Sequence, residues 1–200
     1  MRILVVGASG RLGSAVVDAL ADRHEVVTAS RSHGDHLVDL RNPATIAGLY
    51  ASIGPVDAVA CTAGKTPYAA FDELGSDQFA EGVHDKLLGQ IELVRQGLRH
   101  LPDGGSFTLV SGVLGVDPIR TGSVASTVNG GIDAFVRAAA IELPRGLRVN
   151  AVSATVFAEA WDVYGPLFAG FKPVPVADAA AAYVKSIEGA LTGQVFRVGY

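Results

Sequence analysis

Three glycines at the end of the first apolar run constrain the fold of this chain more than any other feature. Residues 2–6 read Arg-Ile-Leu-Val-Val, which predicts a buried strand, and the amphipathic pattern over residues 12–21 predicts a helix after it. Gly7 lets the chain leave the strand sharply, Gly10 lets a phosphate approach the backbone, and Gly13 lets the helix pack closely on the sheet. Because a helix N-terminus favours anions, this turn predicts a site for the phosphates of a dinucleotide.

The rest of the chain alternates predicted strands with predicted helices. Strands are expected at residues 2–6, 25–29, 56–61, 106–111, 147–152 and 193–198, with a short apolar segment at 36–40, and helices at 12–22, 43–53, 76–100, 123–143 and 176–189. We therefore expect an α/β fold: one Rossmann domain over residues 1–200, with a doubly wound parallel sheet of about seven strands. The stretch 154–175 is rich in aromatic residues and lacks clean periodicity, so we expect a short substrate lid there.

Charge and composition exclude several classes of partner. The net charge is -4 and no run of Lys and Arg occurs, so nucleic acid and anionic membrane surfaces are not expected as partners. No apolar run approaches the roughly 18 residues of a membrane span. One cysteine and five scattered histidines offer neither an internal disulfide nor the spacing of a metal site. We expect a cytoplasmic protein that binds a small molecule and no metal.

The residues after the second predicted strand indicate which dinucleotide is bound. A site that prefers NAD usually places a carboxylate there for the ribose 2′-hydroxyl, whereas this chain has Ser30, Arg31 and Ser32. Arg31 can form charge-assisted hydrogen bonds to a 2′-phosphate, and the two serines can donate from their hydroxyls. The alternative is an arginine that only faces solvent. The sequence therefore favours NADP(H) as the cofactor.

With these elements placed, the chain resembles the short-chain dehydrogenase/reductase family over nearly its whole length. The resemblance rests on the glycine turn, on Asp39-Leu40, on Thr62-Ala63-Gly64, on the segment 135–153 and on residues 192–195. It implies an oxidoreductase that acts on a small carbonyl or alcohol, and a homodimer or homotetramer assembled through the two longest helices. Together with the glycine turn and residues 30–32, it implies cofactor contacts from Gly7, Ser9, Gly10, Arg11, Leu12, Gly13, Asp39, Leu40, Thr62, Ala63, Gly64, Lys86 and Val156.

The family's usual acid and base residues are not found where the resemblance places them. Its Ser, Tyr and Lys positions fall on Gly112, Ala125 and Asn129, and its Asn position falls on Lys86. A missing general acid costs about 10² to 10⁴ in rate, but the cofactor supplies the hydride, so another donor in the same space can replace the acid. Lys86 is the leading candidate, because an ammonium can stabilise a developing alkoxide and its pKa falls when it is buried.

Three further residues complete the candidate set. Ser111 and Asn129 can supply hydrogen bonds, and Tyr164 in the expected lid is the only nearby phenol that the sequence offers as a proton donor. The alternatives are that Lys86 lies at a helix seam with its ammonium in solvent and that Tyr164 only packs. The lid aromatics Trp161, Tyr164, Phe168 and Phe171 predict an apolar or ring-bearing substrate.

Three functions are consistent with these residues. The first is an NADP(H)-dependent oxidoreductase of the short-chain type with a rearranged acid/base set. The second is an NADP(H)-binding sensor or regulator without redox turnover. The third is an enzyme that keeps the cofactor pocket but performs non-redox chemistry.

Overall fold

The computed structural model covers all of residues 1–200 and contains one seven-stranded sheet in which every strand pair is parallel. The strands are β1 (Arg2–Val6), β2 (Glu25–Ser30), β3 (His36–Leu37), β4 (Ala58–Cys61), β5 (Ser106–Val110), β6 (Arg148–Ala154) and β7 (Val195–Val198). Their order is β3-β2-β1-β4-β5-β6-β7. The direction of winding reverses between β1 and β4, which leaves a crevice at the carboxyl ends of the central strands. The predicted Rossmann fold is confirmed.

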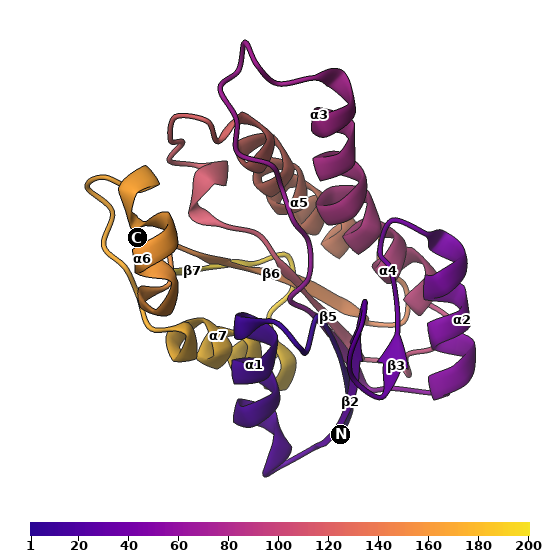
Figure 1. The fold of residues 1–200 in the computed structure, drawn as a ribbon. Coiled ribbons are helices and arrows are strands. Elements are labelled where there is room, and N and C mark those ends of the chain that lie inside the picture. Colours follow the sequence, from indigo (N-terminus) through magenta and orange to yellow (C-terminus); the bar gives the residue numbers. More distant parts are fainter.

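Helices cover both faces of the sheet (Figure 1). One face carries α1 (Arg11–Ala21) and α7 (Val176–Glu188), and the other carries α2 (Pro43–Ile53), α4 (Gly89–Gly97) and α5 (Ser123–Glu142). A buried cluster of 25 apolar residues fills the second side and one of 12 fills the first. Strands buried on both faces need apolar side chains at every position, which is why the central strands are continuous apolar runs without alternation.

The predicted long helix 76–100 is continuous but divides into three segments. These are α3 (Ser76–Gly82), the π-helical segment η1 (Val83–Leu88) and α4. A Cβ at Gly82 would lie 2.5 Å from Val124 Cγ1, and one at Gly89 would lie 2.7 Å from Leu40 Cβ, so close neighbours hold the helix on two sides. An apolar stripe predicts a helix but does not distinguish α from π hydrogen bonding, and π segments are frequent at functional sites.

The segment between β6 and α7 lies over the carboxyl edge of the sheet. It contains η3 (Ala158–Ala160), α6 (Trp161–Tyr164) and η4 (Gly165–Leu167), and a parallel bridge between Phe157 and Val174 closes its base. Its Phe168 is buried with Val156 in a small apolar cluster under the segment. The aromatic residues therefore pack toward the crevice and define one wall of it.

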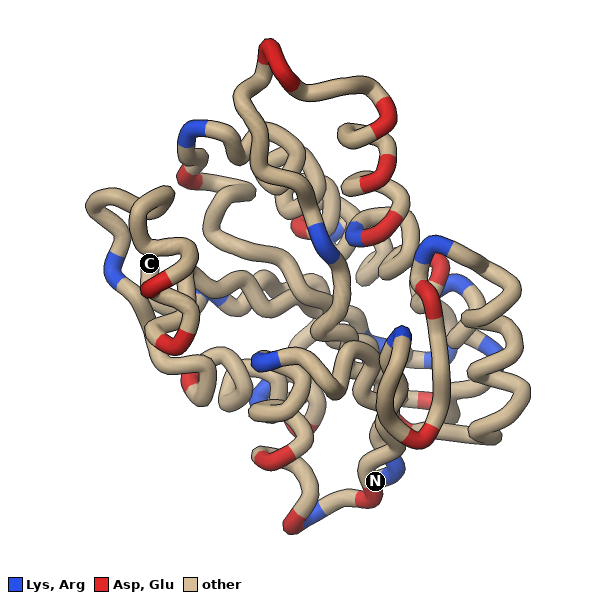
Figure 2. Tube along the Cα trace, viewed as in Figure 1, with Lys and Arg blue, Asp and Glu red and all other residues tan.

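Charged residues lie around the periphery of the fold. Figure 2 shows acidic positions gathered along α3 and the turn before it, whereas Lys and Arg are scattered and form no continuous stripe in this view. None of the helices combines the length and the apolar character needed to cross a membrane. No group of three or more His, Cys, Asp or Glu side chains is arranged to hold a metal ion.

Candidate functional site

The glycine turn has the geometry that a phosphate-binding turn requires. Gly7 adopts a φ of +90°, and its N–H donates to Ala29 O at 2.7 Å, so the chain turns sharply at the strand end. A Cβ at Gly13 would lie 2.0 Å from Gly7 O, which no side chain tolerates. Gly10 caps α1 without a side-chain hydrogen bond, which leaves the first N–H groups of the helix free. Uncapped N–H groups beside such a turn fit the pyrophosphate of a dinucleotide.

The loop after β2 presents one free cation. Arg31 is exposed and takes part in none of the seven ion pairs of the molecule. Ser30 is buried, and its hydroxyl donates to His33 O and accepts from His33 N, so it shapes the loop. The Ser32 hydroxyl lies 2.8 Å from His33 Nδ1. Arg31 is therefore the residue of this loop that is available to a 2′-phosphate.

The one carboxylate of this loop is held by the strand beside it. Asp35 accepts hydrogen bonds from Thr28 N at 2.9 Å and from Thr28 Oγ1 at 2.8 Å, and these bonds lower the pKa of Asp35. A cavity of about 260 Å³ lies between the loop and the glycine turn. Ser9, a predicted cofactor residue, lines it, together with Ser14 and His33, which the sequence did not single out.

The other predicted cofactor residues lie along the carboxyl ends of the strands. Strand β3 ends at Leu37, so Asp39 lies two residues beyond the strand, where its ion pair with Arg41 at 2.6 Å lowers the pKa of the Asp39 carboxyl. The predicted contact residues Leu12 and Leu40 are buried, Arg11 is exposed at the start of α1, and Ala63 is partly buried. Thr62 Oγ1 donates to Val6 O at 3.0 Å, which ties the β4 turn to β1.

A cavity of about 400 Å³ lies at the carboxyl ends of β4, β5 and β6. Lys86, Ser111, Asn129 and Tyr164 all line it, so the structure brings the four candidate catalytic residues together. Gly64 and Val156, two of the predicted cofactor residues, also line it. The remaining wall is largely apolar, with Phe157 and Phe168 from the segment after β6 among its residues.

Lys86 reaches the floor of this cavity from the π segment. Its Nζ donates to Asn129 Oδ1 at 2.8 Å and to Ser111 O at 3.3 Å. An ammonium has three N–H donors, so one remains for a ligand. Burial lowers the pKa of Lys86 to about 8. Gly64 makes this approach possible, because its φ is +130° and a Cβ there would lie 2.6 Å from Lys86 Cγ.

The positions that the family resemblance assigns to Ser and Tyr serve packing. Ala125 is buried in the apolar cluster that contains Leu114 and Phe168, so no hydroxyl reaches the cavity from that position. A Cβ at Gly112 would lie 2.9 Å from Asn129 Nδ2, so the absent side chain leaves room for Asn129. The chain therefore places the Lys86 ammonium of η1 beside the Asn129 amide of α5. The family resemblance assigns the amide to the first of these positions and the ammonium to the second.

The prediction that Tyr164 is the only nearby phenol is wrong. Tyr68 also lines the cavity, its ring centroid lies 6.3 Å from that of Tyr164, and burial raises the pKa of Tyr68. Its signal in the sequence is its place on the segment that leaves the carboxyl end of β4 just after Gly64. Thr155 was also missed. It lines the cavity, and its buried Oγ1 has no hydrogen-bond partner.

Comparisons with known proteins agree with the fold. A family model described as enoyl-(acyl carrier protein) reductase matches residues 2–199. The crystal structure of the protein lin1944 from Listeria innocua is 45% identical, with a TM-score of 0.97 and 98% of each chain covered. A small-chain dehydrogenase in complex with NADPH is 26% identical, with a TM-score of 0.89 over 99% of this chain and 96% of that one.

A curated relative is similar over a shorter part of its own length. Versicolorin reductase stcU of Emericella nidulans is 27% identical over 175 residues, which cover 75% of this chain and 66% of the relative. The chain thus spans about two thirds of the length of this relative.

Proposed function

The chain belongs to the short-chain dehydrogenase/reductase family of oxidoreductases, and from this premise we propose that it is an NADP(H)-dependent enzyme that interconverts a small carbonyl compound and its alcohol. The observation that carries the proposal is the Lys86 ammonium, which lines the cavity with one free N–H and a pKa of about 8. A group with this pKa exchanges a proton readily near neutral pH, as a general acid or base requires.

In this proposal, different residues bind different phosphates of the cofactor. The glycine turn and the N-terminus of α1 hold the pyrophosphate, and Arg31 pairs with the 2′-phosphate. The complex of a structurally similar small-chain dehydrogenase with NADPH supports the choice of cofactor. When bound, the cofactor supplies or accepts the hydride. Gly64 and Val156 line the main cavity, and Thr62 and Ala63 lie beside Gly7 of the glycine turn.

Lys86 provides the proton chemistry in this proposal. During reduction its ammonium donates a proton to the carbonyl oxygen as negative charge develops there, and during alcohol oxidation the neutral amine removes that proton. Asn129 Oδ1 and Ser111 O hold the ammonium in place, which reduces the reorganisation needed at the moment of reaction. These two residues act by positioning Lys86.

The aromatic side chains that line the main cavity suit a ring-bearing substrate. The segment 154–175 acts as a lid in this proposal and contributes Phe157, Tyr164 and Phe168, and Tyr68 faces it from the opposite side. Aromatic side chains stack favourably on planar ligands at centroid separations of about 4.5 to 7 Å. A small aromatic or cyclic ketone or aldehyde is therefore the substrate class that we propose.

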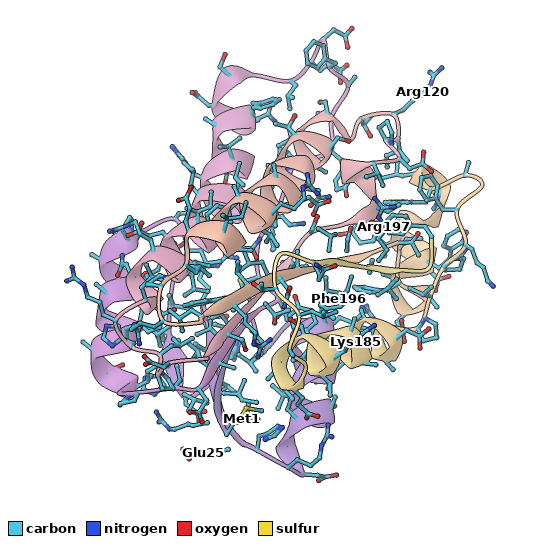
Figure 3. The ribbon with its side chains drawn as sticks, turned by 180° about the vertical axis from the view of Figure 1, so that it is seen from behind. Met1, Glu25, Arg120, Lys185, Phe196 and Arg197 are labelled. Carbon is cyan, nitrogen blue, oxygen red and sulfur yellow. The ribbon has the colours of Figure 1, made fainter.

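The test is a panel of cyclic and aromatic ketones and aldehydes with NADPH, followed by absorbance at the nicotinamide band. Wild-type protein is expected to turn over members of the panel, and Lys86→Met is expected to be slower by about 10² to 10⁴. Lys185→Met is the matched control, because Lys185 lies on α7 over the ring of Phe196, 5.3 Å from its centroid and outside the cavity (Figure 3). Equal rates for wild type and Lys86→Met would remove Lys86 from the mechanism.

A binding protein without redox turnover is the second candidate. This candidate is favoured by Ala125, which stands where the family resemblance places a tyrosine. Ala125 is buried in an apolar cluster, so this position offers no phenol to the cavity. Tight NADPH binding with no turnover of any panel member would support this candidate. Conversion of a substrate without consumption of NADPH would instead support non-redox chemistry in the same pocket.

We also propose that the protein forms a homodimer or homotetramer through α4 and α5. Leu88 and Ile141 lie near or on these helices and are 44% and 88% exposed. Large apolar side chains on an outer helix face favour pairing with a second copy. Sedimentation of wild type and Ile141→Lys measures this directly, and a monomeric wild type would contradict it.

A further inference from the structure

The side chains that line the main cavity carry positive charge and no negative charge. Lys65 and Lys86 are its charged lining residues, and no Asp or Glu lines it. Lys65 directly follows Gly64, and a Cβ at Gly64 would lie 2.6 Å from Lys86 Cγ, so the two lysines reach the cavity from neighbouring backbone. Two cations without a counterion repel each other and attract an anion. The charges of the lining therefore indicate that the ligand of this cavity carries a negative charge.

The acid beside these lysines leaves the Lys65 ammonium free. Asp85 precedes Lys86 on η1, and its carboxylate accepts a hydrogen bond from Lys65 N at 3.3 Å. Asp85 does not line the cavity and forms no ion pair with either lysine. It therefore holds the backbone of the loop after β4 and not the charged end of Lys65. Because Lys65 is exposed, it lies on the solvent side of the cavity, whereas Lys86 lies at the floor.

The polar side chains of the cavity offer chiefly hydrogen-bond donors. An ammonium only donates, and the one side-chain amide oxygen in the lining, Asn129 Oδ1, already accepts from Lys86 Nζ at 2.8 Å. The remaining donors include the Asn129 Nδ2 group and the hydroxyls of Thr66 and Tyr68. Thr155 adds a buried hydroxyl that has no partner in the protein. Buried hydroxyls are normally hydrogen-bonded, so an unpaired one on a cavity-lining residue indicates a polar ligand.

We propose that the substrate carries a carboxylate, which Lys65 binds while the carbonyl group of the substrate lies at Lys86. This inference rests on the proposed function and narrows its substrate class to ring-bearing keto acids and the corresponding hydroxy acids. The Lys65 ammonium has no hydrogen-bond or ion-pair partner in the protein, so all three of its N–H donors are available. Lys86 already donates to Asn129 and Ser111, and its remaining N–H is directed to the carbonyl oxygen in the proposed reaction.

Lys65 determines which substrate binds and takes no part in the proton transfer. A carboxylate keeps its charge throughout the reaction, so its hydrogen bond with Lys65 stabilises the bound substrate and the transition state equally. Such uniform binding lowers KM and leaves kcat unchanged. A charge-assisted hydrogen bond from an exposed ammonium changes the affinity by about tenfold. The effect should be smaller at about 1 M salt than at about 0.1 M, because salt screens exposed charges.

The test compares the binding of meta-acetylbenzoate with that of its uncharged methyl ester by isothermal titration calorimetry. The protein is saturated with the oxidised cofactor NADP⁺, so the ketone is not reduced during the titration. Wild type is expected to bind the acid about tenfold more tightly than the ester. Lys65→Met is expected to lose this preference, and Lys65→Arg, which keeps the charge, to retain it. With NADPH, Lys65→Met should raise KM for the acid about tenfold at an unchanged kcat.

Lys172→Met is the matched control. Lys172 is also an exposed lysine without an ion pair, but it lines a neighbouring cavity of about 810 Å³ and not the main one. Its substitution should leave the preference for the acid at the wild-type value. A loss of preference in Lys172→Met as large as that in Lys65→Met would contradict a specific contact at Lys65.

Three other results would overturn the Lys65 contact. They are equal affinity of wild type for acid and ester, no binding of either compound, and an unchanged preference in Lys65→Met. Weaker NADP⁺ binding by Lys65→Met would assign Lys65 to the phosphates of the cofactor and would also overturn it. A preference for the acid that depends on Lys65, without any reduction of the ketone by NADPH, would support the carboxylate site and overturn the proposed function alone.

Discussion

The substitution Asn129→Asp tests whether the pKa of Lys86 sets the pH dependence of the reaction. Asn129 Oδ1 lies 2.8 Å from Lys86 Nζ, so the change puts a carboxylate oxygen where a neutral amide oxygen accepts the hydrogen bond. A negative charge at this distance favours the ammonium over the amine. The pKa of Lys86, about 8 in the wild type, is therefore expected to rise.

The size of the rise follows from the energy of a charge-assisted hydrogen bond. Such a bond contributes about 1.5 to 3 kcal/mol, compared with about 1 kcal/mol for a neutral one. Because one pKa unit corresponds to about 1.4 kcal/mol, the difference predicts a rise of roughly one unit.

The assay is the pH profile of kcat in both directions. Carbonyl reduction needs the ammonium, so its rate is expected to fall as the pH rises through about 8 in the wild type and at higher pH in Asn129→Asp. Alcohol oxidation needs the amine, so its rate rises over the same ranges. Asn129→Leu removes the acceptor and is expected to move both limbs to lower pH. Profiles that coincide for all three proteins would refute the assignment of this pKa to Lys86.

Three further outcomes are expected. Arg31→Ala should weaken NADPH binding about tenfold and leave NADH binding unchanged, as measured by fluorescence titration, and equal loss for both cofactors would contradict the 2′-phosphate contact. Gly13→Ala should abolish dinucleotide binding and destabilise the fold by about 1 to 3 kcal/mol, because its Cβ would lie 2.0 Å from Gly7 O. Its control Gly48→Ala, on α2 with open space around its Cβ, should raise the free energy of unfolding by about 0.5 to 1 kcal/mol. Finally, the pKa of Lys86 is lowered on folding, so the unfolded chain binds more protons between about pH 8 and 10.5. Denaturant titrations should therefore show the wild type gaining stability over that range relative to Lys86→Met, by up to about 1.4 kcal/mol per pH unit.

The fold follows from the sequence because strand and helix patterns are local. The continuous apolar runs of β1 and β4 and the glycine turn between β1 and α1 each depend on residues within a few positions. The order of the strands then follows from short right-handed crossovers, which leave few alternatives. Strand β3 lies in the short apolar segment 36–40 that the sequence singles out, but the end of this strand at Leu37 and the π segment were not predicted, since both depend on how the chain contacts its neighbours.

The candidate catalytic residues were named individually from the sequence, but their contacts were not. Lys86 and Asn129 are 43 residues apart, and no local pattern states that their side chains meet at 2.8 Å. Tyr68 was missed because it lies on an irregular segment whose path is fixed only by packing.

In the proposed mechanism, Lys86 on η1 and Asn129 on α5 take the places that the family resemblance assigns to an Asn and a Lys, which is why the family's residues are not found at those positions. An ammonium at the cavity floor needs a backbone segment that carries it, a neighbour without a side chain and a hydrogen-bond acceptor. The π segment η1 carries Lys86, Gly64 leaves room for its side chain, and Asn129 Oδ1 accepts its hydrogen bond. What this site requires is the place of the charge rather than the helix that delivers it. A lysine on α5 and a lysine on η1 can therefore serve the same reaction, provided that the amide comes from the opposite helix.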